Sequence, residues 1–370
     1  MQSKNTPYIL FLLLLLFSCG KSDETYTIEI KDGVNYVHNH TPLWGDEPQV
    51  KLIFLQKIGE LEAKDENYMF YNHTDIARDT EGNIYVLDSG NYRIQKFDAN
   101  GKYLLTIGKK GQGPGEILRS RIMCISSDNI IYVPDSENRR VQKFSLNGKA
   151  EGSFRMTARG FSSIRSLKSG KIVHTLLEIP IKSESDKSGS LLALSNMKGE
   201  IIKKFGEILD LGDPIVNTTA NIIYYDVDSK DNIYITFKNE NRIEKYTSDG
   251  ELILRADRPL NYKVENSWKM HKYEMGGRTV ELPLQSLTDV ALGLGIDHKD
   301  RIWINTYKKQ RERDDKFSDY LELEIFNNNG VLLGKVPLPR DGLIKVIGDL
   351  LYILDNKTEM CVYEYKIVEK

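Results

Sequence analysis

An Asp-x-x-Asn-x-Arg motif occurs twice, and it contains groups that could bind a polar ligand. The two copies lie 47 residues apart (135 − 88) and consist of Asp88, Asn91 and Arg93, then Asp135, Asn138 and Arg140. Asp and Asn side chains commonly bond nearby backbone amides in turns. Because the motif repeats at one position of a recurring unit, we interpret it as a device that fixes a turn, with the Arg paired inside the unit.

A long connecting segment, residues 258 to 289, is the main candidate for a binding loop. It carries side chains suited to ligand or partner contact: Tyr262, Trp268, His271, Tyr273 and Arg278. It shows no clear strands, and it contains a Gly276-Gly277 pivot. A loop of this size is usually functional or disordered, and its aromatic residues argue for order. Two interpretations stay open: the aromatic residues cap the core of their own unit, or they line a surface that binds a ligand or a partner.

Bulk properties exclude several functions. The chain has 370 residues, 40% of them hydrophobic and 28% charged, which suits one large or two modest domains. The net charge of −2 leaves no basic excess, so we expect no nucleic-acid binding. No phosphate-binding glycine loop, nucleophile elbow or CxxC pair is present. Cys124 and Cys361 fall inside predicted strands, and we expect buried free thiols there rather than a disulfide.

The elements that position these residues form a repeated unit. Residues 75 to 115 contain four short runs rich in β-branched and aromatic residues, separated by Gly-containing turns, which is the pattern of a four-stranded antiparallel meander. One meander cannot bury both of its faces, and the unit recurs. The aligned positions in the second strands are Tyr85, Tyr132, Val173, Tyr234, Trp303 and Tyr352.

The first two units resemble the NHL-repeat family of β-propellers. The residues that carry the resemblance are GNIYVLDSGNYRIQKFDANG at 82 to 101 and the link GQGPG at 111 to 115. The resemblance implies a propeller over residues 50 to 370. We predict an all-β fold, a six-bladed β-propeller of four-stranded antiparallel blades. The sixth unit lacks a fourth strand, so we expect residues 50 to 58 to complete it and to close the ring.

The spacing between units is uneven, from 41 residues (173 − 132) to 69 residues (303 − 234). The additional residues fall between second and third strands or between blades, at 60 to 72, 178 to 189, 207 to 221, 258 to 289 and 307 to 319. In an up-and-down blade these two kinds of connection emerge on the same side of the ring. The sequence therefore predicts one elaborated rim, and we interpret it as a binding face.

Two groups of enzymes with similar propellers raise the question of a metal. A resemblance to calcium-dependent gluconolactonases would imply oxygen ligands near the channel mouth, and the available residues are Asp75, Asn221, Asp226 and Asp289. Acidic residues are common at strand starts, and no motif of that family is visible. Zinc-dependent amidating lyases use three His, but His73, His174 and His298 lie at different levels of their blades and should not converge. We predict no cofactor, with Ca²⁺ as the alternative.

Residues 1 to 18 have the features of a signal peptide, with Lys4 before the apolar run at 9 to 17. The run ends in Leu16-Phe17-Ser18-Cys19, which resembles a bacterial lipobox and implies diacylation of Cys19. Residues 20 to 24 resemble the signal that takes Bacteroidetes lipoproteins to the cell surface, although a solvated linker has the same composition. We expect 19 to 49 to form a lipidated linker with a hairpin at Asp32-Gly33, on an outer-membrane lipoprotein that faces outward or, alternatively, the periplasm.

These observations predict a membrane-anchored, monomeric propeller that binds a protein, a small molecule or a glycan on its loop-rich face. The alternative is a Ca²⁺- or Zn²⁺-dependent hydrolase or lyase with its site at the channel mouth. Of the two, the sequence favours the binding protein over the enzyme.

Overall fold

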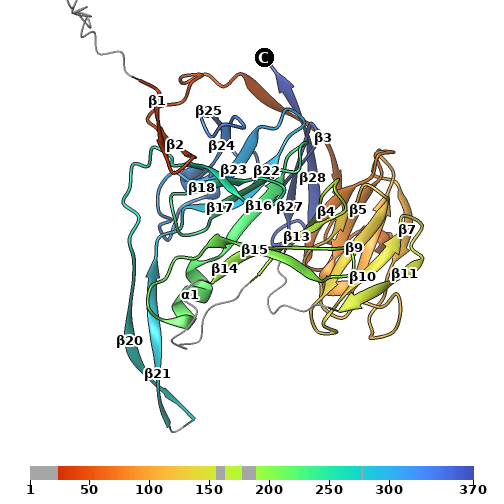
Figure 1. The fold of residues 1–370 in the computed structure, drawn as a ribbon. Helices are drawn as coiled ribbons and strands as arrows, with labels where there is room; N and C mark the ends of the chain where they lie inside the picture. The colour runs from red at the N-terminus through yellow and green to blue at the C-terminus, as the bar shows by residue number, and fades with distance from the viewer. Residues whose placement is uncertain (1–23, 156–162, 177–188, 277) are drawn as a thin grey trace, which may run out of the picture.

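The computed structural model describes residues 24–155, 163–176, 189–276 and 278–370. Within them six four-stranded antiparallel sheets form a ring, so the predicted six-bladed β-propeller is confirmed (Figure 1). Two further strands form a separate two-stranded ribbon that extends away from the ring (Figure 1). The blade strands are arranged as the repeated meander predicts, while the ribbon and two N-terminal strands that extend one of the sheets are additions to that pattern.

The strands of the first three blades, from the channel outward, are as follows: blade 1, β4 (His73–Arg78), β5 (Ile84–Asp88), β6 (Arg93–Phe97) and β7 (Tyr103–Ile107); blade 2, β8 (Cys124–Ile125), β9 (Ile130–Asp135), β10 (Arg140–Ser145) and β11 (Ala150–Arg155); blade 3, β12 (Ile164–Ser166), β13 (Ile172–Thr175), β14 (Ser190–Ser195) and β15 (Ile201–Glu207).

The remaining blades follow the same order: blade 4, β16 (Ile223–Val227), β17 (Ile233–Phe237), β18 (Ile243–Tyr246) and β19 (Leu252–Ala256); blade 5, β22 (Ala291–Ile296), β23 (Ile302–Tyr307), β24 (Leu321–Phe326) and β25 (Leu332–Val336); blade 6, β26 (Leu343–Ile347), β27 (Leu350–Asp355), β28 (Cys361–Glu369) and β3 (Val50–Ile58). The antiparallel pairing of β3 with β28, from Val362 opposite Ile58 to Glu369 opposite Val50, confirms that residues 50 to 58 close the ring.

The second strands of five blades carry an aromatic residue that lies in the core, and blade 3 has Val173 there instead. The side chains of Tyr85, Tyr234 and Trp303 are fully buried. Each bonds, with its hydroxyl or indole N–H, an Asp six residues earlier, in the turn between the first and second strands, at 2.9 to 3.1 Å. A large apolar ring thus fills the gap between neighbouring blades while its polar atom keeps a partner, which explains why the position recurs.

The N-terminal segment from Tyr26 to Ile58 follows the outer edges of three blades, and we call it the N-terminal belt. Its strands β1 (Tyr26–Lys31) and β2 (Val34–Asn39) form a hairpin, and β2 pairs in parallel with β19 of blade 4. The amides of Leu43 and Trp44 then bond carbonyls of β25 in blade 5. The belt ends as β3 in blade 6. The sequence did not predict the first two of these contacts, which satisfy the edge strands of blades 4 and 5.

The four helical segments found among the described residues all lie on one side of the ring, which we call the top rim. They are η1 (Glu66–Tyr68), η2 (Ser89–Asn91), α1 (Pro214–Ala220) and α2 (Phe317–Tyr320). The opposite side, the bottom rim, carries the short turns between first and second and between third and fourth strands. The elaboration of one rim is therefore present in the described residues, while most of the loop at 178 to 189 lies outside them.

The segment at 258 to 289 is not a loop without strands, and this part of the prediction is wrong. It contains β20 (Asn266–Met275) and β21 (Arg278–Leu287), which pair antiparallel over ten residues each. Gly276 adopts a φ of 59°, which a hairpin turn requires and which glycine accepts without strain. Ten extended residues reach about 30 Å, so the ribbon projects well beyond the ring (Figure 1).

Both described cysteines are buried and free, as expected. Burial raises the pKa of the Cys124 thiol to about 12 and that of Cys361 to about 11, so neither is a reactive thiolate at neutral pH. Cys19 and the apolar run before it lie outside the described residues. Inside them, the structure contains no helix of the length and apolarity needed to cross a membrane.

Candidate functional site

The Asp-x-x-Asn-x-Arg motif fixes the top rim of blades 1 and 2, as predicted. In blade 2 the fully buried Asp135 accepts hydrogen bonds from the amides of Leu118 and Arg119, at 3.1 and 3.0 Å, and from Asn138 at 2.6 Å. Arg140 contacts Asp135 and donates to three carbonyl groups of the incoming linker, at 2.8 to 2.9 Å. Asp88, Asn91 and Arg93 do the same in blade 1. No buried side-chain polar atom of the six motif residues lacks a hydrogen-bond partner, so the motif is structural.

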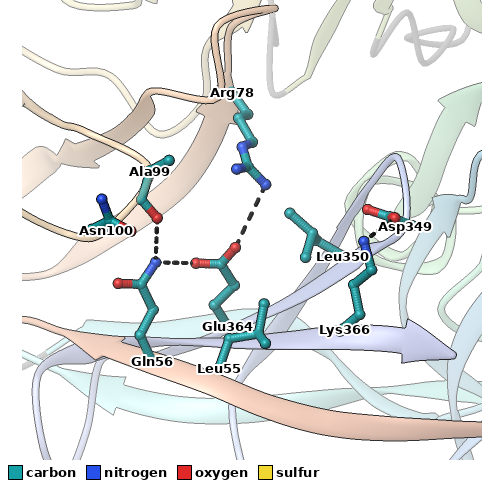
Figure 2. A pocket seen from close by; sticks show the side chains of 9 residues that line it. All are labelled: Leu55, Gln56, Arg78, Ala99, Asn100, Asp349, Leu350, Glu364 and Lys366. Carbon is teal, nitrogen blue, oxygen red and sulfur yellow. Dashed lines mark hydrogen bonds and ion pairs between the residues drawn. The ribbon is translucent and has the colours of Figure 1, made fainter.

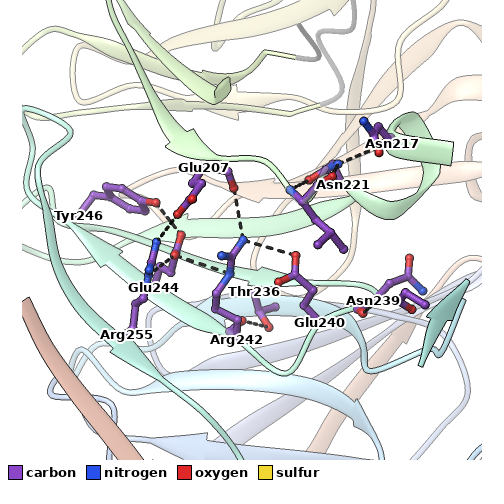
Figure 3. Close-up of polar contacts among 12 residues, drawn as sticks. Glu207, Asn217, Asn221, Thr236, Asn239, Glu240, Arg242, Glu244, Tyr246 and Arg255 are labelled. Atoms are coloured by element: carbon purple, nitrogen blue, oxygen red, sulfur yellow. Dashed lines mark hydrogen bonds and ion pairs between the residues drawn. The ribbon is translucent and has the colours of Figure 1, made fainter. Parts of the chain in front are cut away.

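In blade 4 two of the three motif positions hold different residues. Counted from the second-strand tyrosine, Phe237 replaces the Asp, Glu240 replaces the Asn, and only Arg242 is kept. The Arg242 guanidinium lies 4.1 Å from the centre of the Phe237 ring. It also reaches Glu240 at 3.4 Å (Figure 3). Its Nε atom is buried and has no hydrogen-bond partner among the described residues. We call Phe237, Glu240 and Arg242 the blade 4 variant.

Acidic groups outnumber basic groups around the blade 4 variant. The fully buried Glu244 contacts Arg255 at 2.7 Å and lies 3.6 Å from Arg242, and Arg255 also reaches Glu207 at 2.8 Å (Figure 3). Three carboxylates therefore share two guanidinium groups. Burial raises the pKa of Glu240, which the charge of Arg242 only partly offsets. Burial therefore disfavours the charged form of Glu240.

The base of the ribbon is fixed next to this cluster. Asn266 of β20 donates to the carbonyl of Asn239 at 2.7 Å, and Asn239 donates to the carbonyl of Thr288 at 3.0 Å. The indole N–H of Trp268 donates to the carbonyl of Leu211 at 2.8 Å. Leu211 belongs to the loop before α1. Its amide donates a hydrogen bond to the Asn217 side chain, which fixes this loop. The ribbon is thereby anchored to blade 4 and to the α1 loop, while its distal half extends outward.

The five predicted binding residues fall into two groups. Tyr262 and Trp268 are half-buried at the base, where the Tyr262 hydroxyl donates to the carbonyl of Tyr307 at 3.0 Å. Tyr262 packs against a hydrophobic core cluster, which agrees with its interpretation as a cap, whereas Trp268 contacts the loop before α1. His271, Tyr273 and Arg278 lie further out, and the rings of His271 and Tyr273 are 4.8 Å apart. The structure therefore separates residues that the sequence had grouped.

One face of the ribbon is apolar along β21, where Val280, Leu282 and Leu284 lie, and mixed along β20. In the antiparallel register, Lys269 is opposite Leu284, His271 is opposite Leu282, and Tyr273 is opposite Val280, so these residues share one face. Leu282 and Leu284 are 38% and 44% exposed. We call these six residues the apolar face of the ribbon. The other face carries an ion pair of Lys272 with Glu281 at 3.4 Å.

Two of the four predicted metal candidates bridge blades in the channel. Asp75 of blade 1 contacts Lys345 of blade 6 at 3.0 Å and accepts from the amide of Met123 at the start of blade 2 at 2.9 Å. Asp226 of blade 4 contacts Arg165 of blade 3 at 2.8 Å and accepts from the amide of Ile296 of blade 5 at 3.3 Å. Each carboxylate thus joins three consecutive blades, and together the two sets include all six.

The other two candidates lie elsewhere. Asn221 bonds the amide and the carbonyl of Leu209 in the loop before α1, and Asp289 contacts Lys238 at 3.4 Å. In the part of the chain that the structure describes, no three His, Cys, Asp or Glu residues are grouped so that they could hold a metal ion. The four residues do not form one site.

Sequence reasoning missed Glu240 and Arg242 as members of a distinct site. The signal was available, because an alignment of the repeats on their second-strand tyrosines places Glu240 where the other copies have Asn91 and Asn138. The acid in place of an amide, next to a retained arginine, marks a change in the chemistry of that blade.

Comparison with known proteins agrees with the fold. A family model described as "6-bladed beta-propeller" (DUF5128) matches residues 59–267, more than half of the chain. A member of the DUF4221 family from Bacteroides vulgatus has a TM-score of 0.57 and 13% identity, over 87% of this chain and 99% of that one. A Bacteroides fragilis protein described as exported has the same score and identity, over 90% and 99%. A Xanthomonas campestris gluconolactonase has a TM-score of 0.50 and 11% identity, over 87% and 99%. No curated protein matches the sequence.

Proposed function

The chain belongs to that family of six-bladed β-propellers, and from this premise we propose that it is a protein-binding module whose ribbon docks a partner. The partner presents an apolar surface to the face that His271, Leu282 and Leu284 share. The observation that carries the proposal is the projecting ribbon itself, with exposed leucines on one side.

A ribbon of this kind has a physical need for a partner. An isolated two-stranded hairpin is marginally stable in water, and both of its edges present unpaired backbone groups. Only the base of this ribbon is held by the hydrogen bonds of Asn266 and Trp268, and its distal half extends beyond the ring (Figure 1). Covering the apolar face removes leucine and aromatic surface from water and stabilises both strands.

Cross-linking tests the docking face directly. A photoreactive amino acid in place of Leu282, on the apolar face, should form an adduct with a partner in intact cells. The same substitution at Lys272, which lies on the opposite face of the same strand pair, is the matched control and should form at most a weak adduct. Equal adducts at both positions, or none at Leu282, would contradict the assignment of this face.

Shortening the ribbon separates binding from folding. Replacing residues 269 to 284 by Asn-Gly keeps the Trp268 and Gln285 pair and closes it with a two-residue hairpin turn. Partner capture should be lost, while the thermal midpoint of the ring changes by no more than about 2 °C, because the removed residues lie outside the blades. A much larger fall in the midpoint would show that the ribbon supports the ring.

We also propose that the module is held on the outer membrane through diacylated Cys19. The lipobox-like sequence supports this location. Two acyl chains are enough for stable anchoring. Cys19→Ala should move the protein from the membrane fraction to the soluble fraction and abolish labelling with radioactive palmitate.

The metal-dependent hydrolase or lyase remains the competing prediction, and a direct measurement decides it. Calorimetric titration of the metal-free protein with Ca²⁺ or Zn²⁺ should give no stoichiometric binding if the binding-module proposal is right. Saturable binding of one ion per chain, lost in Asp226→Asn, would favour the enzyme.

A further inference from the structure

The seam where the ring closes, between blades 6 and 1, differs from two other seams. In blades 1 and 4 the residue opposite the second-strand tyrosine is a lysine, Lys96 or Lys245. Each lysine lies over that tyrosine ring, at 5.1 and 5.0 Å, and donates to a carbonyl in the next blade, at 3.2 and 3.0 Å. In both seams an isoleucine of the next blade, Ile125 or Ile296, occupies the last position of the innermost strand before the turn.

Both positions change at the closing seam. Glu364 is opposite Tyr352, where blades 1 and 4 have lysine, and Arg78 of blade 1 replaces the isoleucine. Arg78 lies 3.5 Å from Glu364. The bond to the next blade is made instead by Gln56 of β3, which donates to the carbonyl of Ala99 at 2.9 Å (Figure 2). This carbonyl occupies the place of the one that Lys96 bonds in blade 2.

A pocket of about 610 Å³ opens at this seam on the bottom rim. That volume lies in the usual range for ligand sites. Its lining consists of Leu55, Gln56, Arg78, Ala99, Asn100, Asp349, Leu350, Glu364 and Lys366 (Figure 2). Two cations oppose two carboxylates, and Lys366 is paired with Asp349. A charged ligand would therefore meet a group of its own sign, so the pocket is suited to an uncharged polar molecule.

Hydrogen-bonding groups in the pocket remain available. Arg78 donates from Nε to the carbonyl of Gly82 and from Nη1 to Tyr352, and among the described residues no hydrogen bond involves its Nη2 atom. Within the same residues, the Gln56 Oε1 atom and the Asn100 side chain make no hydrogen bond either. These are planar guanidinium and amide groups, which can bond two adjacent hydroxyl groups at once. Leu55 and Leu350 add apolar surface.

We propose that the seam pocket binds a neutral polyhydroxylated ligand of one or two sugar rings. The site is independent of the ribbon, which lies on the opposite rim, so either proposal can fail without the other. It is formed only when β3 of the N-terminal belt closes the ring, because Leu55 and Gln56 belong to that strand.

Thermal unfolding of the purified full chain tests the proposal, with glucose, galactose, mannose, N-acetylglucosamine and maltose as probes. At least one should raise the midpoint in a saturable way, by about 2 °C at tenfold excess over its dissociation constant. The double variant Arg78→Ile with Glu364→Lys rebuilds the seam found between blades 4 and 5 and should lose the saturable shift. The double variant should still show the small rise in midpoint, linear in sugar concentration, that sugars give to any protein because they are excluded from its surface.

A second pair of variants keeps the test decisive if the double variant does not fold. Asn100→Ala removes an amide of the pocket and should weaken sugar binding about tenfold. Asn147→Ala makes the same change in the equivalent turn of blade 2 and should leave sugar binding unchanged. The proposal is overturned if no probe gives a saturable shift, if the double variant keeps it, or if acetate or phosphate gives the shift and no sugar does.

Discussion

Blades 2 and 4 solve the same problem at the top rim with different side chains. In blade 2, Asp135, Asn138 and Arg140 satisfy one another and fix the incoming linker. In blade 4, Phe237 supplies a ring instead of a carboxylate, and Arg242 keeps only long contacts, of 3.3 Å to the carbonyl of Glu207 and 3.4 Å to Glu240. Local bonding is complete in the first case and incomplete in the second.

The difference in local bonding matches a difference in the segments that pack against the two blades. The linker before blade 2, residues 108 to 123, contains no helix, and the motif fixes it through bonds to its amides and carbonyls. Blade 4 carries the α1 loop and the ribbon base on its top rim and the belt strand β2 on its outer edge, and these supply contacts that the motif no longer provides. Natural proteins depart from their own local rules mainly at functional sites, which agrees with a partner-binding role for the ribbon.

Removal of the buried carboxylate in blade 2 should have the largest effect. Asp135→Ala leaves two amides and the buried edge of Arg140 without an acceptor, so we expect a loss of about 3–5 kcal/mol in the free energy of unfolding. Chemical denaturation measures it. Asp98→Ala, the same change at a partly exposed turn on the bottom rim, should cost about 1 kcal/mol. A loss at Asp135 no larger than that at Asp98 would show that the motif contributes little.

The two arginines give the next largest difference. Arg140→Ala removes three charge-assisted bonds to linker carbonyls, and we expect a loss of about 2–3 kcal/mol. Arg242→Ala should lower the free energy of unfolding by about 1 kcal/mol, chiefly through loss of the contact with the Phe237 ring. The loss is small because Arg255 still neutralises Glu244. Denaturation midpoints of the two variants, measured side by side, check the order. The reverse order would mean that Arg242 has taken over the support of blade 4.

The repeated fold was predictable because its signals are local. Tyr85, Tyr132 and their equivalents mark the second strands, and Gly-containing turns mark the ends of strands, so each blade carries its own pattern. The closing strand was predictable for a related reason: a sheet with three strands leaves an edge, and residues 50 to 58 had the pattern of a fourth strand.

What the sequence did not predict depends on long-range contacts. The partners of Asp75 and Asp226 in the channel are 270 and 61 residues away, so their carboxylates looked like free ligand groups. The pairing of β2 with β19 likewise joins distant segments. In β20 of the ribbon, charged and aromatic side chains fall on both faces, which hides the two-residue period that identifies a half-buried strand. In β21 the period is present at Val280, Leu282 and Leu284.

The smallest expected effect concerns Glu240, and it is best seen as a pH dependence. Because the pKa of Glu240 is raised in the folded protein, the folded state binds more protons than the unfolded state above the ordinary value of 4.5. Its contribution to stability therefore falls as the pH rises through that window, up to the folded pKa. Glu240→Gln removes this charge, so the variant should be as stable as the parent or up to about 1 kcal/mol more stable at neutral pH.

Denaturation curves between pH 4.5 and 7.5 make the measurement. The parent should lose stability relative to Glu240→Gln as the pH rises, with the two nearly equal at the acid end of the range. Glu207→Gln is the matched control, since it changes a largely exposed carboxylate of the same cluster and should alter stability by less than about 0.5 kcal/mol. A parent that gains stability over Glu240→Gln with rising pH would mean that Arg242 fully compensates the buried charge. In that case blade 4 would be as well satisfied as blade 2.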